Sequence, residues 1–201
     1  MAKVYSIDGM IPVIHPDAHV HPDAVLIGDA VVGPRCYVGP GASMRGDMGR
    51  VELKAGSNLQ DNCIMHSFPK SHCTVGVNGH IGHGAILHGC IIEDDAMVGM
   101  HAVIMDDAVI GTKAIVAACA FVPSAMVVEP GTLVGGIPAK FMRTLTDEEI
   151  SWKQSGTREY HILTERSLAT LQAVEPLTEI EPNRPSYSGS DMQPLKKTKR
   201  D

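Results

Sequence analysis

Three histidines stand where they could bind a metal ion. His66 and His88 each follow an aliphatic residue of a six-residue repeat, and His83 lies in the turn before the second of these residues. Neutral imidazole nitrogens bind Zn²⁺ and also suit Fe or Co. Three histidines with one coordination position left for water form a catalytic zinc arrangement, in which the metal lowers the pKa of that water toward neutrality. We therefore expect a zinc site, with iron or cobalt as alternatives.

The repeat determines which of these side chains can meet. Its later aliphatic positions are Ile92, Val98, Ile104, Ile110, Val116, Val122, Val128 and Val134, and its earlier ones are Ile14, Val20, Leu26, Val32, Val38 and Met44. Small residues follow most of them four positions later. This period fits neither a helix nor an alternating strand, but it is typical of a parallel β-helix in which three hexapeptides form one triangular coil. We predict an all-β solenoid of about seven coils.

Counting coils predicts two ladders of polar side chains. Arg45, His66 and His88 follow positions on one face of three successive coils, so they should lie about 4.8 Å apart, the spacing of adjacent strands. On the preceding face Asp61 and His83 should be neighbours, with Gln60 beside them. His66 and His88 can then share one ion, whereas His83 could complete the site across a subunit interface around a three-fold axis. The alternative is that all three are ordinary structural histidines.

Composition limits the remaining possibilities. The 201 residues have room for one domain and an appendage, and the net charge of −6 does not suggest a nucleic-acid partner. No segment approaches 18 consecutive apolar residues, and the N-terminus has no apolar run, so we expect neither a membrane span nor a signal peptide. Five cysteines, odd in number and without CxxC spacing, suggest reduced thiols in a cytoplasmic protein.

The chain divides into three parts by pattern. We expect a β-helix domain over residues 1–140, a C-terminal helical segment over 141–174, and an extended, largely disordered tail over 175–201 that ends in a solvated basic run. Thr146 and Glu149 form the pattern of a capping box at the start of the helix. Apolar residues at roughly helical spacing predict that this helix packs along the solenoid, and Gly156 should bend or break it.

Several motifs carry a family resemblance. They are Arg45-Gly46-Asp47, Gln60-Asp61-Asn62, Met65-His66, Gly82-His83 and Leu87-His88-Gly89-Cys90, and together they resemble the γ-class carbonic anhydrase-like hexapeptide-repeat superfamily. Further motifs, including Gly156-Thr157-Arg158-Glu159-Tyr160, extend the likeness over residues 3–184 to the branch of the phenylacetic acid degradation protein PaaY and its carnitine-operon relative. The resemblance implies a left-handed β-helix and a homotrimer with metal sites between subunits.

The resemblance also implies roles for individual residues. It assigns metal binding to His66, His83 and His88, and it implies an intersubunit ion pair between Arg45 and Asp47. It places Gln60 and Asp61 beside the metal-bound water, which Gln60 could orient. Tyr160 could reach the pocket from the C-terminal helix. Each of these five residues also has a purely structural interpretation, as a corner amide, an interface charge or a helix-packing aromatic.

These features predict a metal-dependent hydrolase. The PaaY branch implies an acyl-CoA thioesterase of phenylacetate catabolism. One alternative is carbonic anhydrase activity on CO2 and bicarbonate at the same site. The loops after Asp47 and His66 lack the glutamates that serve as the proton shuttle in efficient γ-type enzymes, which argues against fast CO2 hydration. A second alternative is a non-catalytic accessory factor of CoA-dependent catabolism, and a hexapeptide acyltransferase is a third.

Overall fold

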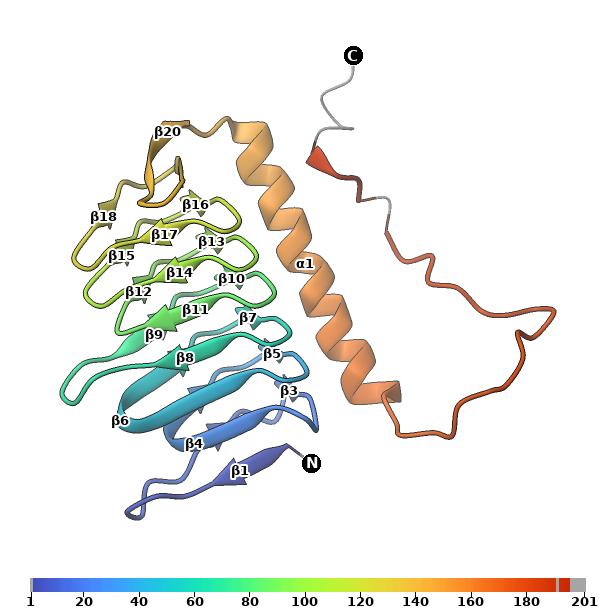
Figure 1. Ribbon diagram of the computed structural model, residues 1–201. Coiled ribbons are helices and arrows are strands. Elements are labelled where there is room, and N and C mark those ends of the chain that lie inside the picture. The colour runs from blue at the N-terminus through green and yellow to red at the C-terminus, as the bar shows by residue number, and fades with distance from the viewer. Residues whose placement is uncertain (1, 191, 196–201) are drawn as a thin grey trace.

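The computed structural model describes residues 2–190 and 192–195. The chain forms a parallel β-solenoid of about seven turns with one long C-terminal helix along its side (Figure 1). Short strands on three faces are joined by tight corners, and every pairing between named strands is parallel except the last one, between β19 and β20. The fold predicted from the six-residue period is confirmed.

Two faces of the solenoid belong to one twelve-stranded sheet. The first face contains β1 (Lys3–Tyr5), β4 (Val25–Val32), β6 (Ser43–Leu53), β8 (Ile64–His66), β11 (Ile86–His88), β14 (Val103–Ile104) and β17 (Phe121–Val122). The second contains β2 (Val13–Ile14), β9 (Cys73–Val75), β12 (Ile91–Ile92), β15 (Val109–Ile110) and β18 (Val127–Val128). The long strands β4 and β6 pass from the first face to the second and so join the two.

The third face is an eight-stranded sheet that lies beneath the helix. Its strands are β3 (His19–Val20), β5 (Tyr37–Val38), β7 (Asn58–Leu59), β10 (His80–Ile81), β13 (Met97–Val98), β16 (Ile115–Val116), β19 (Thr132–Gly135) and β20 (Lys140–Thr144). The final strand, β20, runs antiparallel to β19 and closes the end of the stack. This closure matters because the last coil of a solenoid otherwise leaves a sheet edge unpaired.

The repeat residues fill the interior of the solenoid. Met44, Met65 and Leu87 are fully buried and lie in register on three neighbouring strands, as coil counting predicts. Their interior contacts are aliphatic from the first coils to the last, so each turn is held mainly by burial against the turns above and below. The residue that directly follows each interior position therefore has a fixed place in the stack of coils.

A single helix, α1 (Asp147–Thr170), follows the end of the solenoid. The predicted capping box is confirmed: the Glu149 amide donates to the Thr146 hydroxyl at 3.3 Å, and the Thr146 amide donates to the Glu149 carboxylate at 3.0 Å. The prediction that Gly156 breaks the helix in two is wrong, because the helix is continuous over 24 residues, and a bend there stays a prediction. Glycine lowers helix stability by only about 1 kcal/mol, and packing along the solenoid outweighs that cost.

The side of α1 that faces the solenoid is polar. Its buried residues are Glu149, Lys153, Thr157 and Thr164, whereas Leu168 is half-exposed. The Lys153 ammonium donates to the Asn78 carbonyl at 2.7 Å, and burial lowers the pKa of Lys153 to about 8. The helix therefore docks as predicted, through hydrogen bonds to corner carbonyls together with the edge-on packing of Tyr160 against Tyr37 and His80.

Beyond α1, residues 171–190 contain neither helix nor strand, and the chain loops outward before it returns to the helix (Figure 1). Residue 191 and residues 196–201, which include the basic run, lie outside the described residues. All five cysteines are unpaired thiols. Within residues 2–190 and 192–195, no helix combines the length and apolarity needed to cross a bilayer.

Candidate metal site

His66 and His88 are in register on neighbouring strands. β8 and β11 pair so that His66 lies opposite His88, and their ring centroids are 5.1 Å apart. The His66 Nδ1 and His88 Nε2 atoms face each other at 3.1 Å. Phe68, from the loop that follows β8, packs edge-on against the His88 ring with a centroid distance of 4.9 Å. The predicted ladder is confirmed for these two histidines.

A carboxylate contacts the second nitrogen of each of these rings. The Asp47 Oδ1 atom lies 3.0 Å from His66 Nε2, and the Asp106 Oδ1 atom lies 2.6 Å from His88 Nδ1. Asp47 also accepts a hydrogen bond from Arg45 at 2.8 Å. Burial raises the pKa of the Asp47 carboxyl, but hydrogen bonds from Arg45 and His66 outweigh burial and lower the pKa overall. The pairing of Arg45 with Asp47, implied between subunits, occurs here within one chain.

The third histidine lies at the opposite corner of the same face. The His83 Nδ1 atom is 2.8 Å from Asp61 Oδ2, which confirms the predicted second ladder. His83 lies in the turn before β11, and His88 is the last residue of that strand, so the two histidines stand at opposite ends of β11. One zinc ion, which binds ligand nitrogens at about 2.0–2.1 Å, cannot reach both of them within one chain. Accordingly, no group of three metal-binding side chains occurs within the single chain among residues 2–190 and 192–195.

The chemistry of this donor set fits a metal ion. Two nitrogens bound to one tetrahedral zinc at 2.0–2.1 Å should be about 3.3 Å apart, close to the 3.1 Å between His66 Nδ1 and His88 Nε2. Metal-binding histidines usually donate their other ring N–H to a carboxylate or carbonyl, and each of the three histidines has such a carboxylate partner. His66 and His88 would hold the ion from one chain, and His83 would require a second chain.

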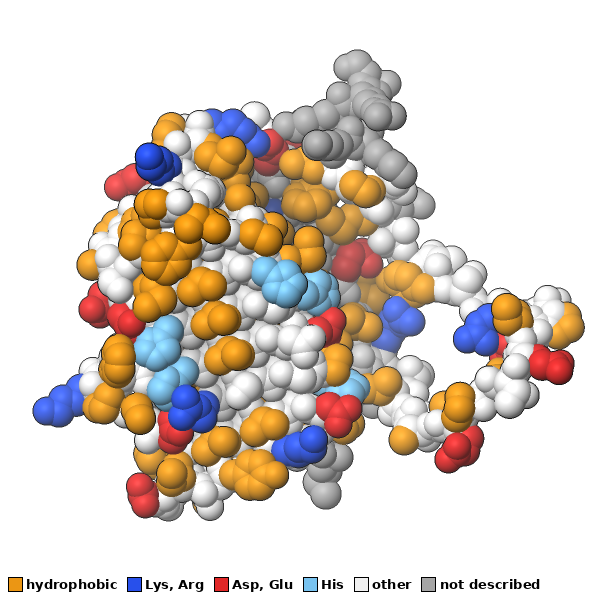
Figure 2. Space-filling model, viewed as in Figure 1, with side chains coloured by type: hydrophobic (Ala, Val, Ile, Leu, Met, Phe, Trp, Pro, Cys, Tyr) orange, Lys and Arg blue, Asp and Glu red, His pale blue; other side chains and the backbone are white. Residues whose placement is uncertain are grey.

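Apolar side chains separate the two histidine corners. Ile64 and Ile86 lie on the first face between His83 and His88, and Met100 stands beside His83 on the next coil; all three are exposed. Figure 2 shows pale-blue histidine side chains at both edges of this face with orange apolar side chains between them. Exposed aliphatic residues at this spacing suit contact with another protein surface.

Gln60 and Tyr160 lie around the corner from the histidines, under α1. Gln60 is 3% exposed, and its side-chain amide donates to the side-chain Oδ1 atom of Asn58 at 3.0 Å and contacts His80 Nε2 at 2.8 Å. Tyr160 packs edge-on against Tyr37 and His80. Burial, and then the charge of Asp61, raise the pKa of the Tyr160 phenol. In the single chain both side chains are engaged in helix–sheet packing, and neither contacts the three histidines.

Asp106 is the site residue that sequence reasoning missed. It lies two residues after the interior position Ile104, one coil beyond His88. Continuing the coil count past His88 puts Met105 in line with it, so a simple ladder does not reveal the carboxylate. A usable signal was the acidic pair Asp106-Asp107 at this corner.

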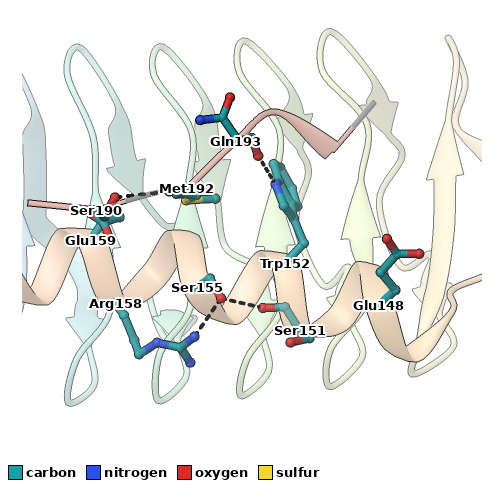
Figure 3. A pocket seen from close by; sticks show the side chains of 9 residues that line it. All are labelled: Glu148, Ser151, Trp152, Ser155, Arg158, Glu159, Ser190, Met192 and Gln193. Carbon is teal, nitrogen blue, oxygen red and sulfur yellow. Dashed lines mark hydrogen bonds between the residues drawn. The ribbon is translucent and has the colours of Figure 1, made fainter. Parts of the chain in front are cut away.

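A separate cavity of about 500 Å³ lies between α1 and the returning chain, and none of the predicted site residues lines it (Figure 3). The Trp152 indole N–H donates to the Gln193 carbonyl at 2.9 Å, and the Met192 side chain lies over Gly156. The predicted tail thus contacts the outer side of the helix over its described residues.

Comparisons with known proteins agree on one family. A family model described as bacterial transferase hexapeptide (six repeats) matches residues 11–46 and 89–124. The carnitine operon protein CaiE of Citrobacter koseri is 54% identical over 186 residues, which cover 92% of this chain and 94% of the relative. CaiE of Salmonella newport is 53% identical over 191 residues, 94% and 96% of the two chains.

Solved structures agree on the architecture. A Bacillus cereus protein to which acetyltransferase activity is ascribed superposes with a TM-score of 0.82 at 29% identity, over 84% of this chain and 98% of the other. A hexapeptide transferase family protein from Anaplasma phagocytophilum has a TM-score of 0.78 at 32% identity, over 81% and 96% of the two chains.

Proposed function

This chain belongs to the hexapeptide-repeat, left-handed β-helix family of the carnitine operon protein CaiE, and on that premise we propose that it is a metal-dependent hydrolase of acyl-CoA thioesters. The observation that carries the proposal is the set of three histidines, each held by a carboxylate at 3.0 Å or less. Other histidines near a carboxylate lack this geometry: His15 and His21 lie 3.7 and 3.9 Å from theirs.

A homotrimer would complete the site. His66 and His88 lie at one corner of the first face and His83 at the other, so a cyclic arrangement brings His83 of one subunit to the His66–His88 corner of the next. The exposed Ile64 and Ile86 between these corners would be buried in the contact. Such an assembly has three equivalent metal sites, all between subunits.

The residues then have distinct roles. His66, His88 and the His83 of a neighbouring subunit would hold Zn²⁺, which when bound would supply Lewis acidity and lower the pKa of a water molecule toward neutrality. Asp47 and Asp61 orient His66 and His83 through their second ring nitrogens, and Arg45 holds Asp47 in place. Phe68 stands over His88 and is 56% exposed, so it offers an apolar wall for an acyl group. Gln60 is hydrogen-bonded to Asn58 in the single chain, and we assign it to the packing of the third face beneath α1.

The decisive experiment combines metal analysis with a panel of substrates. Protein reconstituted with zinc should release CoA from at least one aromatic or quaternary-ammonium acyl-CoA, the second class being chosen because the relatives are named for carnitine. The His66→Ala variant should lose both bound zinc and CoA release, whereas His15→Ala, which changes an exposed histidine of the first coils, should lose neither. Zinc-loaded protein without hydrolysis of any thioester would overturn the proposal.

Acyl transfer is a second candidate, because the two solved structures are described as transferases. It predicts that CoA release requires an added amine or hydroxyl acceptor and that the acyl group appears on that acceptor.

CO2 hydration would use the same metal site and is tested by stopped-flow measurement on the same samples. If the protein has an accessory role without catalysis, cells that carry the His66→Ala variant should behave like cells that carry the wild-type protein.

A further inference from the structure

Asp106 makes the shortest contact of any carboxylate with the three histidines. Its Oδ1 atom lies 2.6 Å from His88 Nδ1, and both side chains are largely buried, at 18% and 23% exposure. An ionised carboxylate can only accept hydrogen bonds, so the proton of a neutral His88 ring lies on Nδ1. The Nε2 atom then carries the lone pair, and it is this atom that faces His66.

The backbone leaves space for this contact at Gly89. A Cβ atom at Gly89 would lie 2.4 Å from Asp106 Oδ1, closer than real Cβ contacts come. Gly89 also has φ of +55°, in the left-handed region where other residues are strained. The Gly89 amide donates to the His66 carbonyl, and the Gly89 carbonyl accepts from the Asp107 amide, so the corner is tied to both neighbouring coils. Any side chain at position 89 would push Asp106 away from His88.

His66 is held in the complementary way. With Asp47 on its Nε2 atom, the His66 proton lies on Nε2 and the lone pair on Nδ1. In these neutral forms two lone pairs face each other across 3.1 Å, which is repulsive unless the two nitrogens share a proton or bind a metal cation. Asp106 and Asp47 together orient two neighbouring imidazole rings so that their lone pairs can bind one cation.

We propose that Asp106 is a positioning residue that holds His88 with its proton on Nδ1 and its Nε2 lone pair toward His66, and that Gly89 is required because it leaves room for Asp106. The metal-binding part of this inference rests on the proposed function, but the position of the proton on His88 can be tested without any metal.

The first test is long-range ¹H–¹⁵N NMR of the metal-free protein. The wild type should show His88 protonated on Nδ1, and Asp106→Leu should shift the ring toward the form protonated on Nε2. Asp106→Asn keeps an acceptor oxygen and should retain the wild-type form. The matched control is Asp107→Asn, which changes the exposed neighbour and should leave His88 unaffected. A wild-type His88 protonated on Nε2 overturns the inference.

The second test is zinc affinity, measured by competition with a chromogenic chelator. Asp106→Leu should bind zinc about 10- to 100-fold more weakly, Gly89→Ala similarly, and Asp107→Asn like the wild type. Unchanged zinc affinity in Asp106→Leu overturns the metal-binding part. If the wild type binds no zinc, the proposed function fails, while the NMR result still decides the role of Asp106. If Asp106→Leu does not fold, the NMR spectra of the wild type and of Asp106→Asn decide the role of Asp106.

Discussion

His66 Nδ1 and His88 Nε2 lie 3.1 Å apart on adjacent strands, while His83 lies at the far corner of the same face. The first prediction follows from this separation. In the proposed homotrimer, a protein carrying His83→Ala and another carrying His88→Ala should each lack zinc. When the two are coexpressed in equal amounts, about one quarter of the sites should combine an intact His66–His88 corner with an intact His83 from the neighbour, and recover zinc.

Metal content of the purified mixed trimers measures this recovery. Coexpression of His66→Ala with His88→Ala is the control, because both changes fall on the same corner and no intact site can form. Equal zinc content in the two mixtures would contradict a site shared between subunits.

The second prediction concerns Gly46, which precedes Asp47 on β6. A Cβ atom there would lie 2.4 Å from the Asp29 carbonyl oxygen and 2.5 Å from its carbon. Gly46→Ala should therefore separate β6 from β4, lower the free energy of unfolding by about 1–3 kcal/mol, and weaken zinc binding by displacing Asp47. Chemical denaturation and chelator competition measure the two effects.

Gly131→Ala is the comparison for that variant. Gly131 has φ of +65°, and no atom lies within 4 Å of the position that an added Cβ would take. Its replacement should therefore cost backbone strain of about 1 kcal/mol and leave zinc binding unchanged. A loss of zinc affinity in both variants would show that general destabilisation, and not displacement of Asp47, causes it.

The third prediction concerns acid stability. Burial, with smaller contributions from the charges of Lys153 and His83, lowers the pKa of His80 to about 3. The unfolded chain binds a proton at this residue near pH 6.5, whereas the folded chain does not until about pH 3. The free energy of unfolding should therefore fall as the pH is lowered from 6.5 toward 3, with this residue contributing up to about 1.4 kcal/mol per pH unit.

Denaturation curves at several pH values measure that slope. Glutamine at position 80 cannot titrate in this range. The slope of the free energy of unfolding against pH should therefore be smaller in His80→Gln, by the contribution of up to one bound proton. Parallel pH profiles for the two proteins would refute the assignment to His80.

The fourth prediction concerns the start of α1. Glu149 is 1% exposed and binds Arg143 through both carboxylate oxygens, one contact being 2.7 Å. Arg143→Met removes the charge that compensates the buried Glu149 carboxylate and should therefore lower the free energy of unfolding, although solvent around the half-exposed Arg143 weakens this ion pair. Arg158→Met, at an exposed arginine of the same helix, should change stability by less than about 0.5 kcal/mol. Thermal or chemical denaturation tests both, and equal losses would contradict the role of the Arg143–Glu149 pair.

Much of the site was predictable because a solenoid converts sequence separation into spatial position. Once Met65 and Leu87 are recognised as interior residues of successive coils, the residues that follow them must be neighbours, and the contact of His66 with His88 confirms this. Asp61 and His83 meet for the same reason. Asp106 escaped this reasoning because its contact with His88 runs diagonally across a corner, where turn geometry and side-chain length decide which atoms meet.

The sequence by itself determined the solenoid, its interior and the two histidine ladders, because a six-residue period allows only one set of residues to face inward. Only the tertiary structure decided that α1 is continuous and docks through polar side chains, since the corner carbonyls that receive Lys153 and His161 belong to turns far away in sequence. Tertiary structure also decided that Gln60 turns toward Asn58 and His80, because its hydrogen-bond partners become neighbours only when the coils stack.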